Sequence, residues 1–223
     1  MDHPAPGILP VFPLTGTLLL PGNFLPLNIF EPRYRSLVED AMAGARFIGM
    51  VQPLLPMADN WGPVDDAPDR PALYSVGCAG RIEECEPQPD GRFLIVLRGV
   101  GRFRIRAELA VDRMYRCVRV EYDEFLADLE EPAQTFDPSS LLAAVDSFIR
   151  RYELEFDMDL LRSLTGGILL NALCAALPFG PAEKQALLEA STLSQRLALM
   201  LELMEMGVSQ ATVEELSSPP TIH

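Results

Sequence analysis

The sequence predicts an α+β fold, in which a curved, barrel-like antiparallel or mixed sheet is followed by a C-terminal α-helical bundle. Short apolar runs separated by Gly and Pro fill the first part of the chain, as is typical of strands and turns. From about residue 123 the apolar positions recur with the helical period instead. We therefore expect a β domain at 1–122 with one packed helix at about 32–43, a helical subdomain at 123–210 and a flexible tail at 211–223.

The first half of the predicted β domain contains short strands and one helix. Pro26 interrupts an apolar run that is too short for a helix, which indicates a buried or edge strand. Pro32 suits the first position of a helix, where its missing N–H costs nothing, and Gly44 supplies a stop. The predicted strands are 8–14, 18–20, 24–30 and 46–51.

The second half of the β domain contains longer strands. A Pro- and Gly-containing turn at 87–91 separates the first two, and the sequence Gly-Val-Gly at 99–101 predicts another turn. Apolar residues and arginines alternate from 102 to 109, so this strand should have one buried and one solvated face. The predicted strands are 73–86, 92–98, 102–109 and 114–122.

The predicted helical subdomain contains four helices. The first starts near Asp137 and Pro138 and has an apolar stripe at helical spacing. The others cover 168–177 and start at Pro181 and at Thr192, where Gln195 three residues later predicts a capping box.

Charge and hydropathy restrict the partners. The net charge is −14, and only the segment 81–119 has more arginines than acidic residues, which makes nucleic acid an unlikely partner. The four cysteines lack zinc-site spacing and are expected to be buried thiols. No signal-peptide pattern and no apolar run of membrane-spanning length occurs, so we expect a cytoplasmic protein without membrane contact.

The sequence offers no catalytic, cofactor-binding or metal-binding residues. The histidines are His3 and His223, at the two ends of the chain, and Lys184 is expected on an exposed helix surface. Phosphate-binding glycine motifs are absent. Asp157 and Asp159 resemble the start of a calcium loop, but no oxygen ligand follows at position 161. A hydrolase with two paired carboxylates stays open, because such residues can meet in space.

Two groups of residues are candidates for binding. The Pro-rich segment 53–71 is predicted to be a long surface loop, and its apolar side chains would bind proteins or would fold back over the core. Three arginines in strand 102–109 would bind an anion or would pair with neighbouring acidic residues. The protein-binding candidates are Leu54, Leu55, Met57 and Trp61, and the anion-binding candidates are Arg102, Arg104 and Arg106.

Three blocks resemble the N-terminal, substrate-binding domain of Lon, the ATP-dependent protease. They are FPLTGTLLLPGNFLPLNIFEPRYRSLVEDAM (12–42), VGCAGRIEECEPQPDGRFLIVLRGVGRFRI (76–105) and LLNALCAALPFGPAEKQALLEASTLSQRLALMLELME (169–205). The resemblance implies a PUA-like β domain and a helical subdomain that recognise substrate proteins and contribute to self-association. The segment 53–71 is longer than the resemblance leads us to expect.

The resemblance does not extend to the enzymatic parts of Lon, because the sequence contains no Walker motif and no catalytic Ser-Lys pair. We therefore expect a non-enzymatic protein-binding module, an adaptor that presents unfolded or client proteins to a protease or chaperone in protein quality control. The alternative is a module that binds a small molecule or nucleic acid through its PUA-like sheet. The apolar last helix is compatible with a homodimer and equally with a bundle core.

Overall fold

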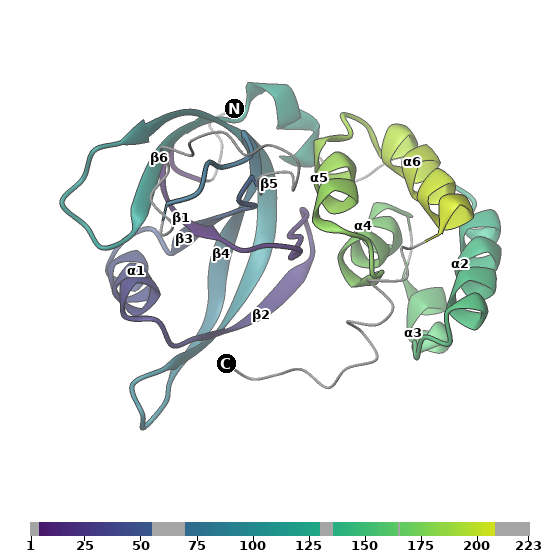
Figure 1. The fold of residues 1–223 in the computed structure, drawn as a ribbon, viewed down its shortest axis with the longest axis horizontal. Helices are drawn as coiled ribbons and strands as arrows, with labels where there is room; N and C mark the ends of the chain where they lie inside the picture. The colour runs from purple at the N-terminus through teal and green to yellow at the C-terminus, as the bar shows by residue number, and fades with distance from the viewer. Residues whose placement is uncertain (1–4, 55–69, 130–135, 165, 208–223) are drawn as a thin grey trace, which may run out of the picture. The chain divides into compact units, whose positions relative to one another are not determined.

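The computed structural model describes residues 5–54, 70–129, 136–164 and 166–207 (Figure 1). The chain divides into two compact units, Met1–Leu129 and Glu130–His223, which we call the β unit and the helical unit. The described residues form six strands and seven helices, so the predicted α+β class is confirmed.

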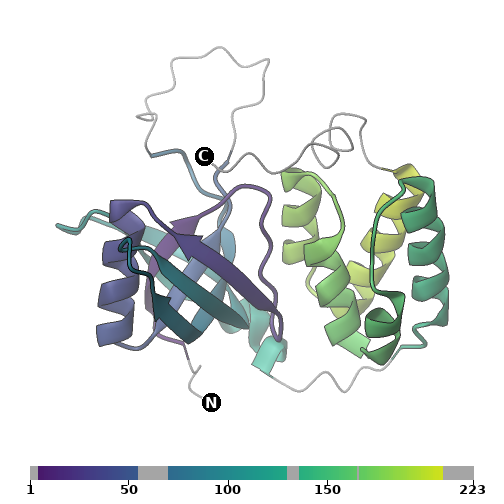
Figure 2. The ribbon, with the colours of Figure 1, turned by 90° about the horizontal axis from the view of Figure 1, so that it is seen from below.

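The β unit is a mixed sheet that closes on itself unevenly (Figures 1 and 2). The strand order is β2-β5-β4-β3-β1-β6, and β6 also pairs with β5, so five strands form a ring and β2 lies outside it. Only β1 and β3 pair in parallel. The strands are β1 (Ile8–Pro13), β2 (Phe24–Ile29), β3 (Phe47–Val51), β4 (Val76–Pro87), β5 (Phe93–Leu109) and β6 (Arg116–Glu121).

The turn predicted at 99–101 is wrong, because β5 runs through it as one strand of 17 residues. Gly80 pairs with Gly99 and Ala79 pairs with Gly101, so Val100 is an extra residue in β5. Such a β-bulge bends a strand without reversing it. The bend allows the first half of β5 to pair with β2 and the second half to pair with β6.

Close packing explains why glycine occupies position 99. A Cβ atom there would lie 2.1 Å from the carbonyl oxygen of Leu20. The segment 18–20, which the sequence predicted as a strand, forms no strand; it is buried, and Leu20 packs against this bend.

The predicted alternation along 102–109 fails for two reasons. A second bulge lies between Ile105 and Ala107, so Ala107 is exposed rather than buried. In addition, η1 (Asp123–Leu129) packs against β5, and Arg102, which was predicted to face solvent, is only 3% exposed. This helix belongs to the β unit, so the units divide seven residues after the predicted boundary at residue 122.

Phe103 lies in the core inside the ring and is completely buried. Its ring meets that of Tyr122 edge to face, with 6.4 Å between the centroids. Gly49 and Gly77 leave room for it, since a Cβ on Gly77 would lie 2.6 Å from the Phe103 ring.

Helix α1 (Pro32–Ala43) lies beside the ring of strands, with one face buried (Figure 2).

The described residues of the helical unit form five helices. The capping box predicted at Thr192 and Gln195 is present at the start of the last helix. One helix was not predicted: Asp157 caps it by accepting hydrogen bonds from the backbone N–H groups of Asp159 and Leu160, which gives this carboxylate a structural role. The helices are α2 (Ser139–Arg151), α3 (Met158–Ser163), α4 (Gly166–Ala176), α5 (Pro181–Glu189) and α6 (Leu193–Met206).

Within the described ranges, no helix combines the length and the apolar character that crossing a membrane requires.

Candidate functional site

The titratable groups form no catalytic or metal-binding cluster. Among the described residues, no group of three or more His, Cys, Asp and Glu side chains could hold a metal ion. Burial raises the pKa of Cys78 and of Cys174 to about 12, so both thiols stay protonated. Lys184 is half-buried rather than fully exposed as expected, and its Nζ donates to the carbonyl of Ala175 at 3.3 Å.

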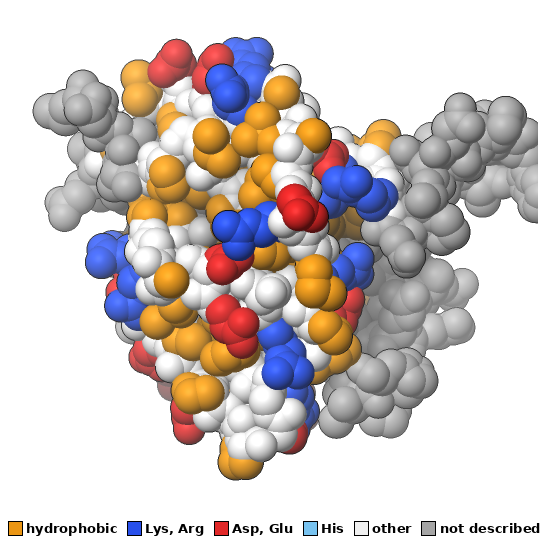
Figure 3. Space-filling view, turned by 90° about the vertical axis from the view of Figure 1, so that its left-hand side faces the viewer, with side chains coloured by type: hydrophobic (Ala, Val, Ile, Leu, Met, Phe, Trp, Pro, Cys, Tyr) orange, Lys and Arg blue, Asp and Glu red, His pale blue; other side chains and the backbone are white. Residues whose placement is uncertain are grey.

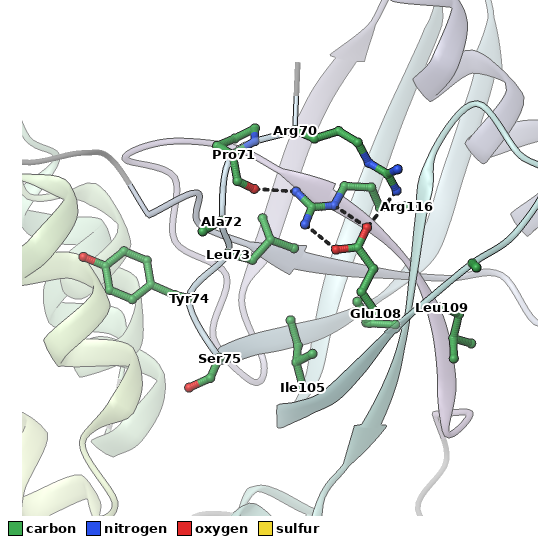
Figure 4. A pocket seen from close by; sticks show the side chains of 12 residues that line it. Arg70, Pro71, Ala72, Leu73, Tyr74, Ser75, Ile105, Glu108, Leu109 and Arg116 are labelled. Atoms are coloured by element: carbon green, nitrogen blue, oxygen red, sulfur yellow. Dashed lines mark hydrogen bonds and ion pairs between the residues drawn. The ribbon is translucent and has the colours of Figure 1, made fainter. Parts of the chain in front are cut away.

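The β unit contains two adjacent cavities of about 600 and 770 Å³. Arg70, Pro71 and Arg116 line both of them, so the two cavities are neighbours, and we refer to them together as the groove. The first cavity lies between β5, β6 and the segment 70–75 (Figure 4). The second lies between the start of α1 and the β5–β6 connection.

Apolar side chains form much of the groove. Leu73, Ile105 and Val118 line the first cavity, and prolines and tyrosines line much of the second. Two apolar residues of the β5–β6 connection stand at its rim, where Val111 is 40% and Met114 is 66% exposed. Apolar groups that face water beside a cavity are typical of surfaces that bind an apolar partner.

Three charged residues lie where the two cavities join (Figure 4). Glu108 accepts hydrogen bonds from Arg116 Nε at 3.0 Å and Nη2 at 2.5 Å, and from Arg70 Nη2 at 2.8 Å. Arg116 Nη1 also donates to the carbonyl of Pro71 at 2.6 Å. The hydrogen bonds from Arg116 are the main cause that lowers the pKa of the Glu108 carboxyl, so Glu108 is ionised at neutral pH.

Further pairs hold the rim of the second cavity. Asp40 of α1 pairs with Arg113 and accepts a hydrogen bond from the Tyr115 hydroxyl at 2.6 Å. Burial, with a contribution from Asp40, raises the pKa of Tyr115 to about 12. Glu31 pairs with Arg33 at 2.8 Å. Each cavity is lined by a single carboxylate among the described residues, so the groove gives no support to a hydrolase with two paired acids.

The predicted protein-binding residues fall at or beyond the edge of the groove. Leu54 is 46% exposed, and its backbone N–H donates to the carbonyl of Ala72 at 2.7 Å. Leu55, Met57 and Trp61 lie outside the described residues. Pro53 and Arg70, which lie before and after this undescribed segment in the sequence, both line the groove.

The three arginines predicted to bind an anion lie outside the groove lining, and each pairs with a carboxylate of the chain. Arg102 pairs with Asp128 at 2.8 Å, Arg104 with Glu124 at 2.7 Å and Arg106 with Glu121 at 2.6 Å. The Arg102 guanidinium also lies over the ring of Phe125, 4.5 Å from its centroid. An anion that binds along this strand would have to displace these carboxylates.

Surface charge is mixed on the face of the molecule in Figure 3. Hydrophobic side chains lie there among acidic and basic ones, and neither sign of charge dominates. This face therefore lacks the broad basic surface that phosphate contacts with nucleic acid require.

Sequence reasoning missed the residues that build the groove. Arg70 and Arg116 are 46 positions apart, and only the closed sheet brings both to Glu108. Val111 and Met114 could have been found, because two apolar side chains in a short connection between strands are unexpected at a surface.

The family model of the ATP-dependent protease La (LON) substrate-binding domain matches residues 8–206. The chain is 27% identical over 203 residues to the Lon protease of Anaeromyxobacter dehalogenans, covering 89% of this chain and 23% of that protein. It is 29% identical over 222 residues to the Lon protease of Syntrophus aciditrophicus, covering 94% of this chain and 27% of that protein. The chain thus spans about a quarter of the length of these relatives.

Solved structures show the same architecture. The crystal structure of a Lon N-terminal domain protein from Xanthomonas campestris has a TM-score of 0.60 and 26% identity, covering 88% of this chain and 98% of that one. The N-terminal domain of the Lon protease of the Mycobacterium avium complex has a TM-score of 0.62 and 20% identity, covering 89% and 98% respectively. The resemblance identified in the sequence is thereby confirmed.

Proposed function

Because the chain belongs to the family of the Lon substrate-binding domain, we propose that it is a non-enzymatic module that binds segments of client proteins in the groove. In this proposal it acts as an adaptor that presents unfolded clients to a protease or chaperone. Self-association into a homodimer would be compatible with this role.

One observation carries the proposal: apolar side chains line two neighbouring surface cavities and remain exposed at their rim. A folded protein presents few apolar side chains to solvent, whereas an unfolded chain presents many. An apolar groove therefore discriminates unfolded from folded clients without any catalytic chemistry. The cavities are of the size that accommodates several side chains of a bound segment.

The test replaces the two rim residues. In the double variant Val111→Ser and Met114→Ser, a permanently unfolded, fluorescently labelled model client should bind about tenfold more weakly, because two apolar contacts are lost. Fluorescence anisotropy measures the dissociation constant. The melting temperature should stay within about 2 °C of the unmodified protein, because both side chains are at the surface.

A matched control is available at Ile8, an apolar residue that is 51% exposed and does not line the groove. The variant Ile8→Ser should bind the client with unchanged affinity. Equal losses in the control and the rim variant would place binding elsewhere, and no binding by the unmodified protein would refute the proposed function.

A further inference from the structure

The charges where the two cavities join are unbalanced. Two guanidinium groups, of Arg70 and Arg116, share the single carboxylate of Glu108. Arg116 is held firmly, since its side chain is 14% exposed and uses three nitrogen atoms for Glu108 and the Pro71 carbonyl. One positive charge of this trio is therefore left without a carboxylate of its own.

Among the described residues of the groove, Arg70 is the guanidinium that remains available. Its side chain is 62% exposed and reaches Glu108 through Nη2 alone. Within the described residues, its Nε and Nη1 have no acceptor. Guanidinium groups favour bidentate binding of carboxylates, so a second carboxylate at this position would complete a set of two cations and two anions.

The whole groove shows the same imbalance. Four arginines and two glutamates line it, whereas the net charge of the chain is −14. Two of these arginines, Arg33 and Arg113, pair with Glu31 and Asp40, so the excess positive charge of the groove comes from Arg70. A positive groove in an acidic protein selects a negatively charged occupant by charge complementarity.

The position of the charge restricts the occupant further. Arg70 and Arg116 line both cavities, so the free positive charge lies between two partly apolar chambers and not at one end. A segment whose carboxylate sits there can place apolar side chains in both chambers. If the bound carboxylate were the C-terminus of the client, the client chain would end there, and one of the two cavities would stay empty.

We propose that the groove recognises client segments in which an internal Asp or Glu side chain is flanked on both sides by apolar residues, with Arg70 binding the carboxylate beside the Arg116–Glu108 pair. This inference rests on the proposed function and defines its substrate class. Specificity then comes from the acidic residue, and the apolar flanks supply most of the contact area.

The test uses three labelled synthetic peptides that share one apolar sequence. The first has a central Glu and blocked ends, the second has Gln in place of Glu, and the third has Gln and a free C-terminal carboxylate. Anisotropy titrations with the unmodified protein should give about fivefold tighter binding of the Glu peptide than of the Gln peptide. The preference should decrease as salt is raised, because the site is partly exposed to solvent.

The variant Arg70→Gln should lose this preference and bind the Glu peptide and the Gln peptide with about equal affinity. Arg106→Gln is the matched control, because Arg106 is also exposed and paired with one carboxylate but lies outside the groove lining. It should keep the fivefold preference. These results together would support the assignment.

Other outcomes would show whether the preference for an acidic residue fails alone or together with the proposed function. Equal binding of the Glu and Gln peptides, a preference that persists in Arg70→Gln, or tightest binding of the peptide with the free C-terminus would each overturn the inference while leaving apolar client binding intact. Failure of all three peptides and of the unfolded model client to bind would overturn both.

Discussion

Replacing Asp128 by Ala should lower the free energy of unfolding by about 3–5 kcal/mol, because it removes the carboxylate from a buried ion pair. Asp128 accepts hydrogen bonds from the backbone N–H of Arg102 at 2.9 Å, from Nε at 2.9 Å and from Nη2 at 2.8 Å. The side chains are 3% and 9% exposed, so water cannot replace the lost partner. Urea unfolding, followed by the loss of β structure, measures the change.

A double variant checks that the loss comes from an uncompensated charge. Arg102→Met together with Asp128→Leu removes both charges and should unfold at a higher urea concentration than Asp128→Ala alone. Recovery should be incomplete, because the backbone N–H of Arg102 still loses its acceptor. An Asp128→Ala variant as stable as the unmodified protein would contradict the role of this buried ion pair.

Replacing Phe103 by Ala should lower the free energy of unfolding by about 3–5 kcal/mol, because it leaves a cavity inside the ring of strands. The side chain is fully buried, and the end of its ring packs against the backbone at Gly49 and Gly77. Strands that pair across the whole sheet cannot move inward to fill the space. The same urea measurement gives the loss.

The exposed Phe24 of β2 provides the matched control for this substitution. It is 63% exposed, so Phe24→Ala should change the free energy of unfolding by less than about 1 kcal/mol. Similar losses at both positions would contradict the placement of Phe103 at the centre of the β unit.

Local patterns in the sequence were sufficient for most of the architecture. Pro32 and the apolar spacing after it predicted α1, and Thr192 with Gln195 predicted the capping box, because both signals act within a few residues of chain. The Gly-Val-Gly segment was misinterpreted, because glycines that allow close backbone approach resemble glycines that form a turn. Helix α3 was missed, because Asp157 was considered as a metal ligand rather than as a cap.

The candidate site was less predictable than the fold. The alternating pattern of residues 102–109 predicted that Arg102 faces solvent. The burial of Arg102 depends instead on η1, about 20 residues further along the chain, about which this local pattern carries no information. Arg70, Glu108 and Arg116 meet only after the sheet has closed. Such sites depend on contacts between distant segments, for which a single sequence contains no direct signal.

The most direct test of client binding in the groove is a methyl NMR titration of the full chain with the unfolded model client. We predict that the largest chemical-shift changes occur at Leu73, Ile105, Val111 and Met114, which line the groove. Methyl groups of Ile8, outside the lining, should change little. Shifts confined to the helical unit, or to Leu25 and Leu27 of the edge strand β2, would contradict the account.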